Sequence, residues 1–442
     1  MRDLARLAHL ARQLEHQTAA CKRCGICQSV CPLFPFTRME KDIARGKIAV
    51  LEGVMAEVVR NAGTVLTQLE NCLLCGRCAA ACPNGVDTAA IFFKSRLLLR
   101  EYLGMSPAKK FFFRQILARP RRFDRAARLA EIIQPLFIKP AGDSTAARPL
   151  RLLPAGILSG RQVPALAPVP LHRLRSTPEP EAQTTARPAR VLFFTGCLID
   201  RIFPRVGQAA LDALEFHGFQ PILLKDEACC GIPALSAGDR PAFERLRKHN
   251  LRQLAGHEFD WLVTACATCA FTIKKLWPRL IDFDNPEAPL IAEATAKTID
   301  ITELLASQLP DVPPAKNNHP EAVTYHDPCH LKTSLGIYES PRRLINASPG
   351  YRLMEMEGAS DCCGMGGGFG LAHHSLSEKI GGLKRDHILD TGCRMVATSC
   401  PACMIQLSGM LAPVTDRKIE VCHPVELYMR GKLKNDGPPQ RL

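Results

Sequence analysis

Two pairs of adjacent cysteines constrain this chain more than any other feature. Each pair is followed by glycine, as Cys229-Cys230-Gly231 and Cys362-Cys363-Gly364, and each lies in the middle of a set of five cysteines. The first set is Cys197, Cys229, Cys230, Cys266 and Cys269, and the second is Cys329, Cys362, Cys363, Cys400 and Cys403. Corresponding cysteines are 132 to 134 positions apart, which indicates an internal duplication. Five thiols exceed the four of a tetrahedral zinc site, so iron–sulfur chemistry is the leading hypothesis.

The first 100 residues carry a second cysteine pattern. Two C-x2-C-x2-C-x3-C-P runs, at 21–32 and 72–83, match the ligand arrangement of a two-cubane ferredoxin. Three closely spaced cysteines wrap one face of a cube, and the fourth points away to complete the other. The predicted ligands are therefore Cys21, Cys24, Cys27 and Cys82 for the first cubane 4Fe-4S cluster, and Cys72, Cys75, Cys78 and Cys31 for the second. Structural zinc is the alternative for these eight thiols.

Helical patterns surround the two runs. Residues 45–61 place Ile48, Leu51, Val54, Met55, Val58 and Val59 on one face, so we expect a helix with these residues in the core. Residues 109–139 are basic and amphipathic, with a break at Pro120. This segment is either a solvated basic face over packed helices or a docking surface for an anionic membrane or an acidic partner.

The rest of the chain predicts two similar α/β units after a proline-rich segment. Short apolar strands near 191–194, 221–224 and 260–264 each lead to cysteines of the first set, and 323–325, 351–354 and 395–398 do so for the second. Helices between the strands favour a largely parallel sheet, and ligands bind at the carboxyl ends of such strands. Each CxxC is also expected to begin a helix, whose N-terminal dipole favours thiolates.

The predicted fold class is α+β overall: a helical two-cluster ferredoxin domain followed by two duplicated α/β cysteine-rich units. The expected domains are residues 1–139, a linker at 140–189, a first unit at 190–310 and a second at 321–432, with a hinge at 311–320.

The complete sets of five cysteines resemble the cysteine-rich CCG domain of heterodisulfide reductase. With the ferredoxin runs, nearly the whole chain resembles the iron–sulfur subunits of glycolate oxidase and the related lactate dehydrogenases, and the anaerobic glycerol-3-phosphate dehydrogenase subunit is also similar. The resemblance implies that each set of five holds a non-cubane 4Fe-4S cluster, so one or two such clusters are expected beside the two cubanes. Some glycolate oxidase subunits have lost cysteines of the first set, whereas all five are present here.

Other residues near the cysteines have two interpretations each. His326 and His330 flank Cys329 and are candidate hydrogen-bond donors to cluster sulfur, or ordinary packing histidines. Asp327 and Glu227 are candidate proton relays, although loop or capping roles are favoured. The glycine-rich 364–370 segment follows a cysteine pair, which favours close backbone approach over nucleotide binding. Cys393 and Cys422 fit neither pattern and are expected to be buried thiols.

Composition narrows the function classes. Twenty cysteines favour thiolate ligands in a reducing compartment, so we expect a cytoplasmic protein, with a peripheral position at the inner face of a membrane as a further option. No apolar run reaches the roughly 18 residues that span a bilayer, and the first 20 residues lack the continuous core of a signal peptide. Cluster thiolates offset much of the formal net charge of +14, and no nucleic-acid-binding signature accompanies the basic residues, so no nucleic-acid partner is expected.

The sequence contains no dinucleotide fingerprint, no Walker loop and no base–nucleophile set, so its catalytic residues are unknown and no flavin is expected in this chain. The resemblance implies electron transfer from an FAD-dependent hydroxy-acid dehydrogenase subunit to a membrane quinone, a membrane redox complex or another carrier. Whether the chain is itself an enzyme stays open at this stage. The alternatives are a heterodisulfide-reductase-like subunit that reduces a disulfide at a non-cubane cluster, and a zinc-stabilised scaffold.

Overall fold

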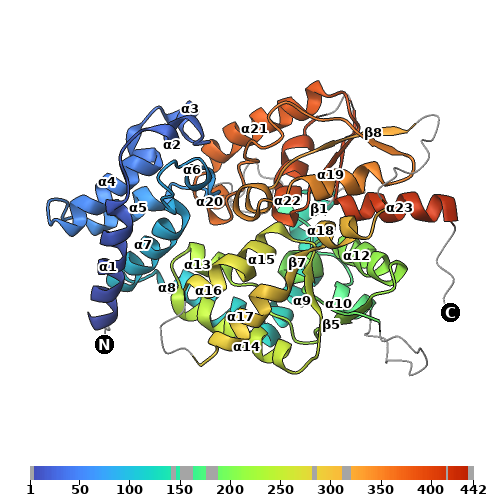
Figure 1. Cartoon of the computed structure of the whole chain (residues 1–442), viewed down its shortest axis with the longest axis horizontal. Helices are drawn as coiled ribbons and strands as arrows, with labels where there is room; N and C mark the ends of the chain where they lie inside the picture. Colours follow the sequence, from blue (N-terminus) through green and yellow to red (C-terminus); the bar gives the residue numbers. More distant parts are fainter. Residues whose placement is uncertain are drawn as a thin grey trace.

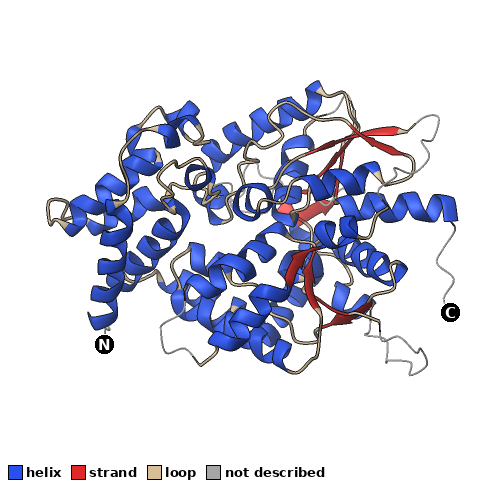
Figure 2. Ribbon diagram, viewed as in Figure 1, coloured by secondary structure: helices blue, strands red, loops and turns tan. Residues whose placement is uncertain are grey.

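The computed structural model describes residues 4–140, 146–149, 163–175, 188–280, 286–310, 320–414 and 417–436. A helical N-terminal part lies beside two α/β units, one formed by the green-to-yellow part of the chain and one by the orange-to-red part (Figure 1). Each unit has its own sheet with helices packed around it (Figure 2). The mixed fold class expected from the sequence is therefore confirmed.

Short helices joined by tight turns build the N-terminal part. Its elements are α1 (Leu4–Ala19), α2 (Ile26–Ser29), α3 (Phe34–Thr37), η1 (Glu40–Asp42), α4 (Ala44–Met55), α5 (Ala62–Glu70), α6 (Arg77–Ala80) and α7 (Thr88–Leu103). Gly25 and Gly76 precede α2 and α6 with φ of 88° and 74°, a left-handed conformation that lets each cysteine run turn sharply. The core around α7 buries Leu14, Ile48 and Phe93.

The helix predicted at 45–61 ends earlier than expected. α4 stops at Met55, and Glu57 has a φ of 60°, which turns the chain out of the helix. Ile48 and Leu51 are buried as predicted, but Val58 is 79% exposed. The apolar pattern continued past the end of the helix, so the assignment of Val58 to the buried face was wrong.

The basic segment breaks where the sequence indicated. It forms α8 (Pro107–Phe111), the π-helical η2 (Phe112–Leu117) and α9 (Pro120–Phe137), with Pro120 at the start of α9. The segment expected to be an extended linker contains β1 (Ile138–Pro140), β2 (Ala146–Pro149) and β3 (Val163–Pro164), which pair antiparallel in this order, and then α10 (Leu171–Leu174). These strands had no periodic pattern that the sequence analysis could detect.

The first α/β unit is a parallel sheet with strand order β5-β4-β6-β7. Its elements are β4 (Arg190–Phe193), α11 (Gly196–Arg201), α12 (Pro204–Phe216), β5 (Gln220–Leu223), α13 (Ile232–Ser236), α14 (Arg240–Ala255), β6 (Trp261–Thr264), α15 (Ala267–Phe271), η3 (Thr272–Leu276), α16 (Trp277–Arg279), α17 (Ala288–Lys297), β7 (Thr298–Asp300) and α18 (Ile301–Ser307).

The second unit repeats this order as β9-β8-β10-β11, again parallel. Its elements are β8 (Glu321–Tyr325), η4 (His330–Ser334), α19 (Glu339–Asn346), β9 (Tyr351–Leu353), α20 (Gly368–Ala372), α21 (His374–Asp390), β10 (Met395–Ala397), α22 (Pro401–Leu411), β11 (Glu420–Cys422) and α23 (Pro424–Asp436). The matching order supports the inferred duplication. The three expected strands of each unit are present, and the sequence analysis missed the fourth strands, β7 and β11.

The last helix connects the two units. α23 packs against α12, and the side chains of His217 and Tyr428 form a 2.9 Å hydrogen bond between them. Residues 311–319 of the expected hinge lie outside the described residues. Among the described helices, none combines the length and the apolar character needed to cross a bilayer.

A glycine in α4 provides a test of this packing. A β-carbon at Gly46 would overlap the backbone carbonyl of Glu40, which cannot rotate away, whereas one at Gly382 in α21 would meet no atom within 4 Å. We predict that Gly46→Ala lowers the free energy of unfolding by about 1–3 kcal/mol. The control Gly382→Ala should be neutral or stabilising by up to about 1 kcal/mol, because alanine favours helix. Anaerobic thermal unfolding measures both variants, and equal stabilities would contradict the described contact between α4 and η1.

Candidate metal centres

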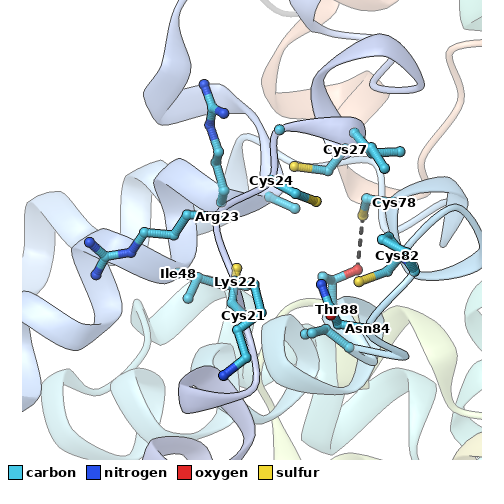
Figure 3. A pocket seen from close by; sticks show the side chains of 16 residues that line it. Cys21, Lys22, Arg23, Cys24, Cys27, Ile48, Cys78, Cys82, Asn84 and Thr88 are labelled. Carbon is cyan, nitrogen blue, oxygen red and sulfur yellow. Dashed lines mark hydrogen bonds between the residues drawn. The ribbon is translucent and has the colours of Figure 1, made fainter.

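The first cysteine run lines a small cavity in the N-terminal part. Cys21, Cys24 and Cys27 come from the turn before and within α2, and Cys82 follows α6. Their sulfurs point toward a common space, while Arg23 points away from it (Figure 3). Cys78 also reaches this cavity, where its sulfur lies 2.9 Å from the hydroxyl of Thr88. The four thiols that the sequence assigned to the first cubane thus face one another.

A neighbouring cavity is lined by Cys31, Cys72, Cys75 and Cys78, the thiols assigned to the second cubane. The backbone N–H of Leu74 points at the sulfur of Cys72 at 3.4 Å. Cys78 lines both cavities, so the two sets are direct neighbours.

A buried arginine fixes the loop that carries Cys72. Arg96 of α7 donates hydrogen bonds to the carbonyls of Leu69 (2.7 Å) and Cys72 (2.9 Å), and a third to that of Ser236 in the first α/β unit (2.9 Å). Burial lowers the pKa of Arg96, and the nearby Cys72 opposes this change. The arginine therefore holds the second cavity against the first unit, a role that its place in an apolar helix did not suggest from sequence.

The five cysteines of the first unit converge from three strand ends. Cys197 follows β4, Cys229 and Cys230 follow β5, and Cys266 and Cys269 follow β6. The sulfurs of Cys197 and Cys229 are 3.7 Å apart. Cys266 caps α15, and its sulfur accepts the N–H of Cys269 at 3.4 Å, so the expected helix after this CxxC is confirmed.

Backbone contacts hold the cysteine pair of the first unit in place. Trp277 donates its indole N–H to the carbonyl of Cys230 at 3.1 Å, and Asn250 donates to that of Cys229 at 3.1 Å. A β-carbon at Gly196 would lie 2.8 Å from the sulfur of Cys269. Gly196 therefore lets the chain approach that thiol closely, at a φ of 64° that suits glycine.

The second unit gathers its five thiols in the same way. The sulfurs of Cys363 and Cys403 are 3.5 Å apart, and the N–H of Gly364 points at the sulfur of Cys362 at 3.4 Å. Cys400 caps α22, so the helix expected after the second CxxC is also present.

A histidine lies among these thiols. His326 is 1% exposed, and one of its ring nitrogens lies within 4.8 Å of the sulfurs of both Cys363 and Cys403. No other hydrogen-bond partner is seen for either ring nitrogen among the described residues. This placement is consistent with a hydrogen bond to sulfur.

The duplicated sites differ at this position. Phe194 is the residue of the first unit that corresponds to His326. The backbone N–H of Phe194 donates to the carbonyl of Val263 in β6 at 2.7 Å, and that of His326 donates to the equivalent carbonyl of Ala397 in β10 at 2.9 Å. Phe194 is buried and apolar. A β-carbon at Gly196 would lie 2.8 Å from the sulfur of Cys269 and 3.9 Å from the ring of Phe194, so a phenyl ring lies near the first set and an imidazole near the second.

The two candidate proton-relay carboxylates, Glu227 and Asp327, stabilise the loops around the cysteines. Glu227 accepts the backbone N–H groups of Thr195 (2.9 Å) and Gly196 (2.6 Å), and burial raises its pKa to about 8. Asp327 forms ion pairs with Arg342 (2.7 Å) and Lys332 (3.0 Å). Desolvation acts to raise the pKa of Asp327, but the hydrogen bonds and charges of its two partners outweigh it and lower that pKa. These contacts match the loop roles that the sequence favoured.

The second candidate histidine lies where the three parts of the chain meet. His330 contacts the carbonyl of Leu74 at 3.3 Å and the hydroxyl of Thr268 at 3.1 Å, and it stacks on Phe271 with 4.5 Å between ring centres. Burial lowers its pKa, which favours the neutral ring. Because the carbonyl can only accept, the neutral ring donates to Leu74 and accepts from Thr268.

The second cavity adjoins the second five-thiol set. Cys75 and Cys362 pack in one buried cluster, with Cys31 and Cys329 against it. Arg77, within the second cysteine run, pairs with Asp361 at 3.0 Å. A β-carbon at Gly366 would lie 2.6 Å from Leu73, so the glycine-rich segment approaches the loop of the second cavity closely.

The two five-thiol sets also touch. The N–H of Ala267, inside the first CxxC, donates to the carbonyl of Ser399 at 3.0 Å. The hydroxyl of Thr268 lies 3.3 Å from the sulfur of Cys400. All four sets therefore form one continuous series: first cavity, second cavity, second unit, first unit. The sequence predicted the sets but had no signal for this order.

The residues present fit iron–sulfur clusters. None of the twenty cysteines forms a disulfide, and the Cys197–Cys229 and Cys363–Cys403 sulfurs are 3.7 and 3.5 Å apart, well beyond the roughly 2 Å of a disulfide bond. Burial raises the pKa of the Cys75, Cys78 and Cys329 thiols, so without a cation these groups would stay protonated. Gathered buried thiols with N–H groups aimed at sulfur are what clustered iron requires. Cys393 and Cys422 lie outside the sets and are buried, as expected.

Comparison with known proteins agrees with this arrangement. Residues 17–86 match the 4Fe-4S dicluster domain, and residues 191–274 and 323–408 match the cysteine-rich domain named CCG. The "Probable glycolate oxidase iron-sulfur subunit" of Bacillus subtilis (strain 168) is 26% identical over 95% of each chain. "Lactate utilization protein A" of Exiguobacterium sp. is 26% identical over 57% of this chain and 98% of that protein.

A third relative is a component of the dihydromethanophenazine:CoB–CoM heterodisulfide reductase of Methanosarcina acetivorans, 24% identical over 87% of each chain. Relatives above 30% identity match about half of this chain, and this chain spans less than half of their length. The chain therefore carries a 4Fe-4S dicluster domain followed by two cysteine-rich CCG domains.

Proposed function

We propose that this chain is the iron–sulfur electron-transfer subunit of a flavin-dependent 2-hydroxy-acid dehydrogenase complex, with lactate or glycolate as substrate. The observation that carries the proposal is the continuous series of four thiol sets, which runs from the partly exposed first cavity to the buried sets of the two α/β units. The relatives named for glycolate oxidase and lactate utilization support this substrate class. The domain division proposed with it is a ferredoxin domain at 1–139, a linker at 140–189, and two cysteine-rich units at 190–310 and 321–432.

The proposed cofactors are two cubane 4Fe-4S clusters and one or two non-cubane ones. Cys21, Cys24, Cys27 and Cys82 would hold the first cubane, and Cys72, Cys75, Cys78 and Cys31 the second. The two five-cysteine sets would hold the non-cubane clusters. When bound, such clusters supply one-electron transfer at potentials set by their surroundings.

The chain's own residues keep these sites dry and fixed. Most thiols of the two units are buried, which excludes water from the sulfurs. The N-termini of α15 and α22 direct their dipoles at the capping cysteines and stabilise thiolate. Arg96, Trp277 and Asn250 hold the cysteine loops through hydrogen bonds to backbone carbonyls. Because these hydrogen bonds do not involve the thiol groups, they do not depend on whether a thiol has lost its proton.

The proposal assigns the carbon chemistry to a partner. An FAD-dependent dehydrogenase subunit would oxidise the hydroxy acid, and a quinone, a membrane redox complex or another carrier would accept the electrons. A peripheral position at the inner face of the membrane belongs to this proposal.

A heterodisulfide-reductase-like activity is the second candidate. Its support is the presence of all five thiols in both units and the likeness to a heterodisulfide reductase component. The chemically reduced, isolated chain would then reduce a disulfide with two electrons and two protons, giving two thiols. Absence of thiol release from such a preparation would exclude this activity.

Iron analysis tests the cofactor assignment. Anaerobically purified protein should contain about sixteen irons per chain when all four sites are filled. Cys82→Ala should lose the same electron paramagnetic resonance (EPR) signal as Cys24→Ala, and Cys31→Ala the same signal as Cys75→Ala. Cys422→Ala, which removes a buried thiol outside the sets, is the matched control and should keep all signals. Stoichiometric zinc in a colourless protein would contradict the assignment.

Exchanging the residues that differ between the two units tests the role of His326. A hydrogen bond to cluster sulfur raises the reduction potential, so His326→Phe should lower the midpoint potential of the second unit's site. Phe194→His should raise that of the first unit's site. Anaerobic redox titration followed by EPR measures both changes. Unchanged potentials in both variants, with full iron content, would assign His326 to packing alone.

A further inference from the structure

One face of α9 exposes an unusual combination of side chains. Arg121, Arg125, Leu129, Ile132 and Leu136 follow one another at spacings of three or four residues, so they form a single stripe along the helix. The three apolar members are 60%, 74% and 63% exposed in chain order. The stripe is basic where the helix begins and apolar toward its end.

The opposite face anchors α9, so the stripe cannot turn inward. Asp124 pairs with Arg201 of α11 at 2.5 Å and with Arg128 at 2.8 Å. Gln134 makes two hydrogen bonds, of 2.9 and 3.0 Å, with the backbone of Leu166. Asp124 and Gln134 thus hold α9 to the protein, and Leu129, Ile132 and Leu136 remain exposed on the stripe.

A basic groove continues the stripe. Arg121, Arg122 and Arg125 line one side of it, and Arg245, Lys248 and Arg252 of α14 line the other. Two of its three acidic side chains are engaged, Glu244 with Arg240 at 2.6 Å and Glu287 with Lys248 at 3.4 Å. Within the described part of the chain, Arg121, Arg125 and Arg252 have no ion-pair partner. The groove is therefore a concentration of uncompensated positive charge.

The charge and the apolar stripe together indicate the occupant. An acidic protein surface would neutralise the arginines but would not by itself account for three exposed aliphatic side chains beside them. An anionic lipid surface satisfies both, because headgroup phosphates pair with arginines while aliphatic side chains enter the acyl boundary.

We propose that α9 and the adjoining groove dock this protein on an anionic membrane surface. Phospholipid headgroups pair with Arg121, Arg125 and Arg252, and Leu129, Ile132 and Leu136 enter the lipid boundary. This inference gives a location to the membrane position in the proposed function, but it does not depend on which donor or acceptor the protein serves.

Vesicle flotation of the full-length protein, prepared anaerobically, tests the proposal. The protein should float with phosphatidylcholine vesicles that contain phosphatidylglycerol, and much less with phosphatidylcholine alone. Added salt should weaken the binding, because surface charge is screened. Ile132→Gln combined with Leu136→Gln, and Arg121→Glu combined with Arg125→Glu, should each weaken partitioning at least about tenfold.

Matched controls come from exposed residues elsewhere. Val58→Gln removes an exposed aliphatic side chain in the N-terminal part, and Arg352→Glu with Arg394→Glu reverses two exposed charges in the second unit. These variants should bind like the unaltered protein. Two results would overturn the proposal. One is that the α9 variants bind the anionic vesicles as well as the unaltered protein does. The other is that the unaltered protein does not float with these vesicles, whether or not a purified protein partner binds this face. Iron content, measured in parallel, reports on the proposed function separately, since the α9 variants should keep it.

Discussion

The structure depends on one junction, at which the three parts of the chain meet around buried thiols. His330 donates to Leu74 of the N-terminal part and accepts from Thr268 of the first unit, while its own backbone follows Cys329 of the second. Thr268 in turn contacts the sulfur of Cys400. Because these contacts join the loops that carry the cysteines, they set the separation of the thiol sets.

Duplication accounts for the symmetry of the two units, and local substitution accounts for their difference. Both sheets have the same strand order, and in both a CxxC begins a helix at the same place. Yet an imidazole lies beside the thiols of one unit and a phenyl ring beside those of the other. A polar neighbour and an apolar one give two similar sites different surroundings, which is how a protein obtains different potentials from one type of cluster.

Much of the architecture could be predicted from sequence, because the spacing of the cysteines depends on the geometry of the sites that they form. The thiol sets, the strands before Cys197 and Cys329, and the helices after each CxxC all follow from local pattern. Val58 was misplaced because apolar periodicity cannot register a turn such as the left-handed one at Glu57. Strands β7 and β11 were missed because the predicted strands were located by the cysteines of the two sets that follow them, and no such cysteine follows β7 or β11. The order of the sets depends on contacts such as Arg77–Asp361, 284 residues apart in sequence, which no local pattern encodes.

The central claim is that the second dicluster cavity and the second unit's five thiols form adjacent links of one series. Low-temperature EPR of the fully reduced, anaerobic protein tests it most directly. Because Cys75 and Cys362 lie in one buried cluster, we expect spin–spin broadening of the second unit's signal, and this broadening should disappear in Cys75→Ala while the signal itself remains. A superposition of independent, unbroadened signals, identical with and without Cys75, would contradict the account.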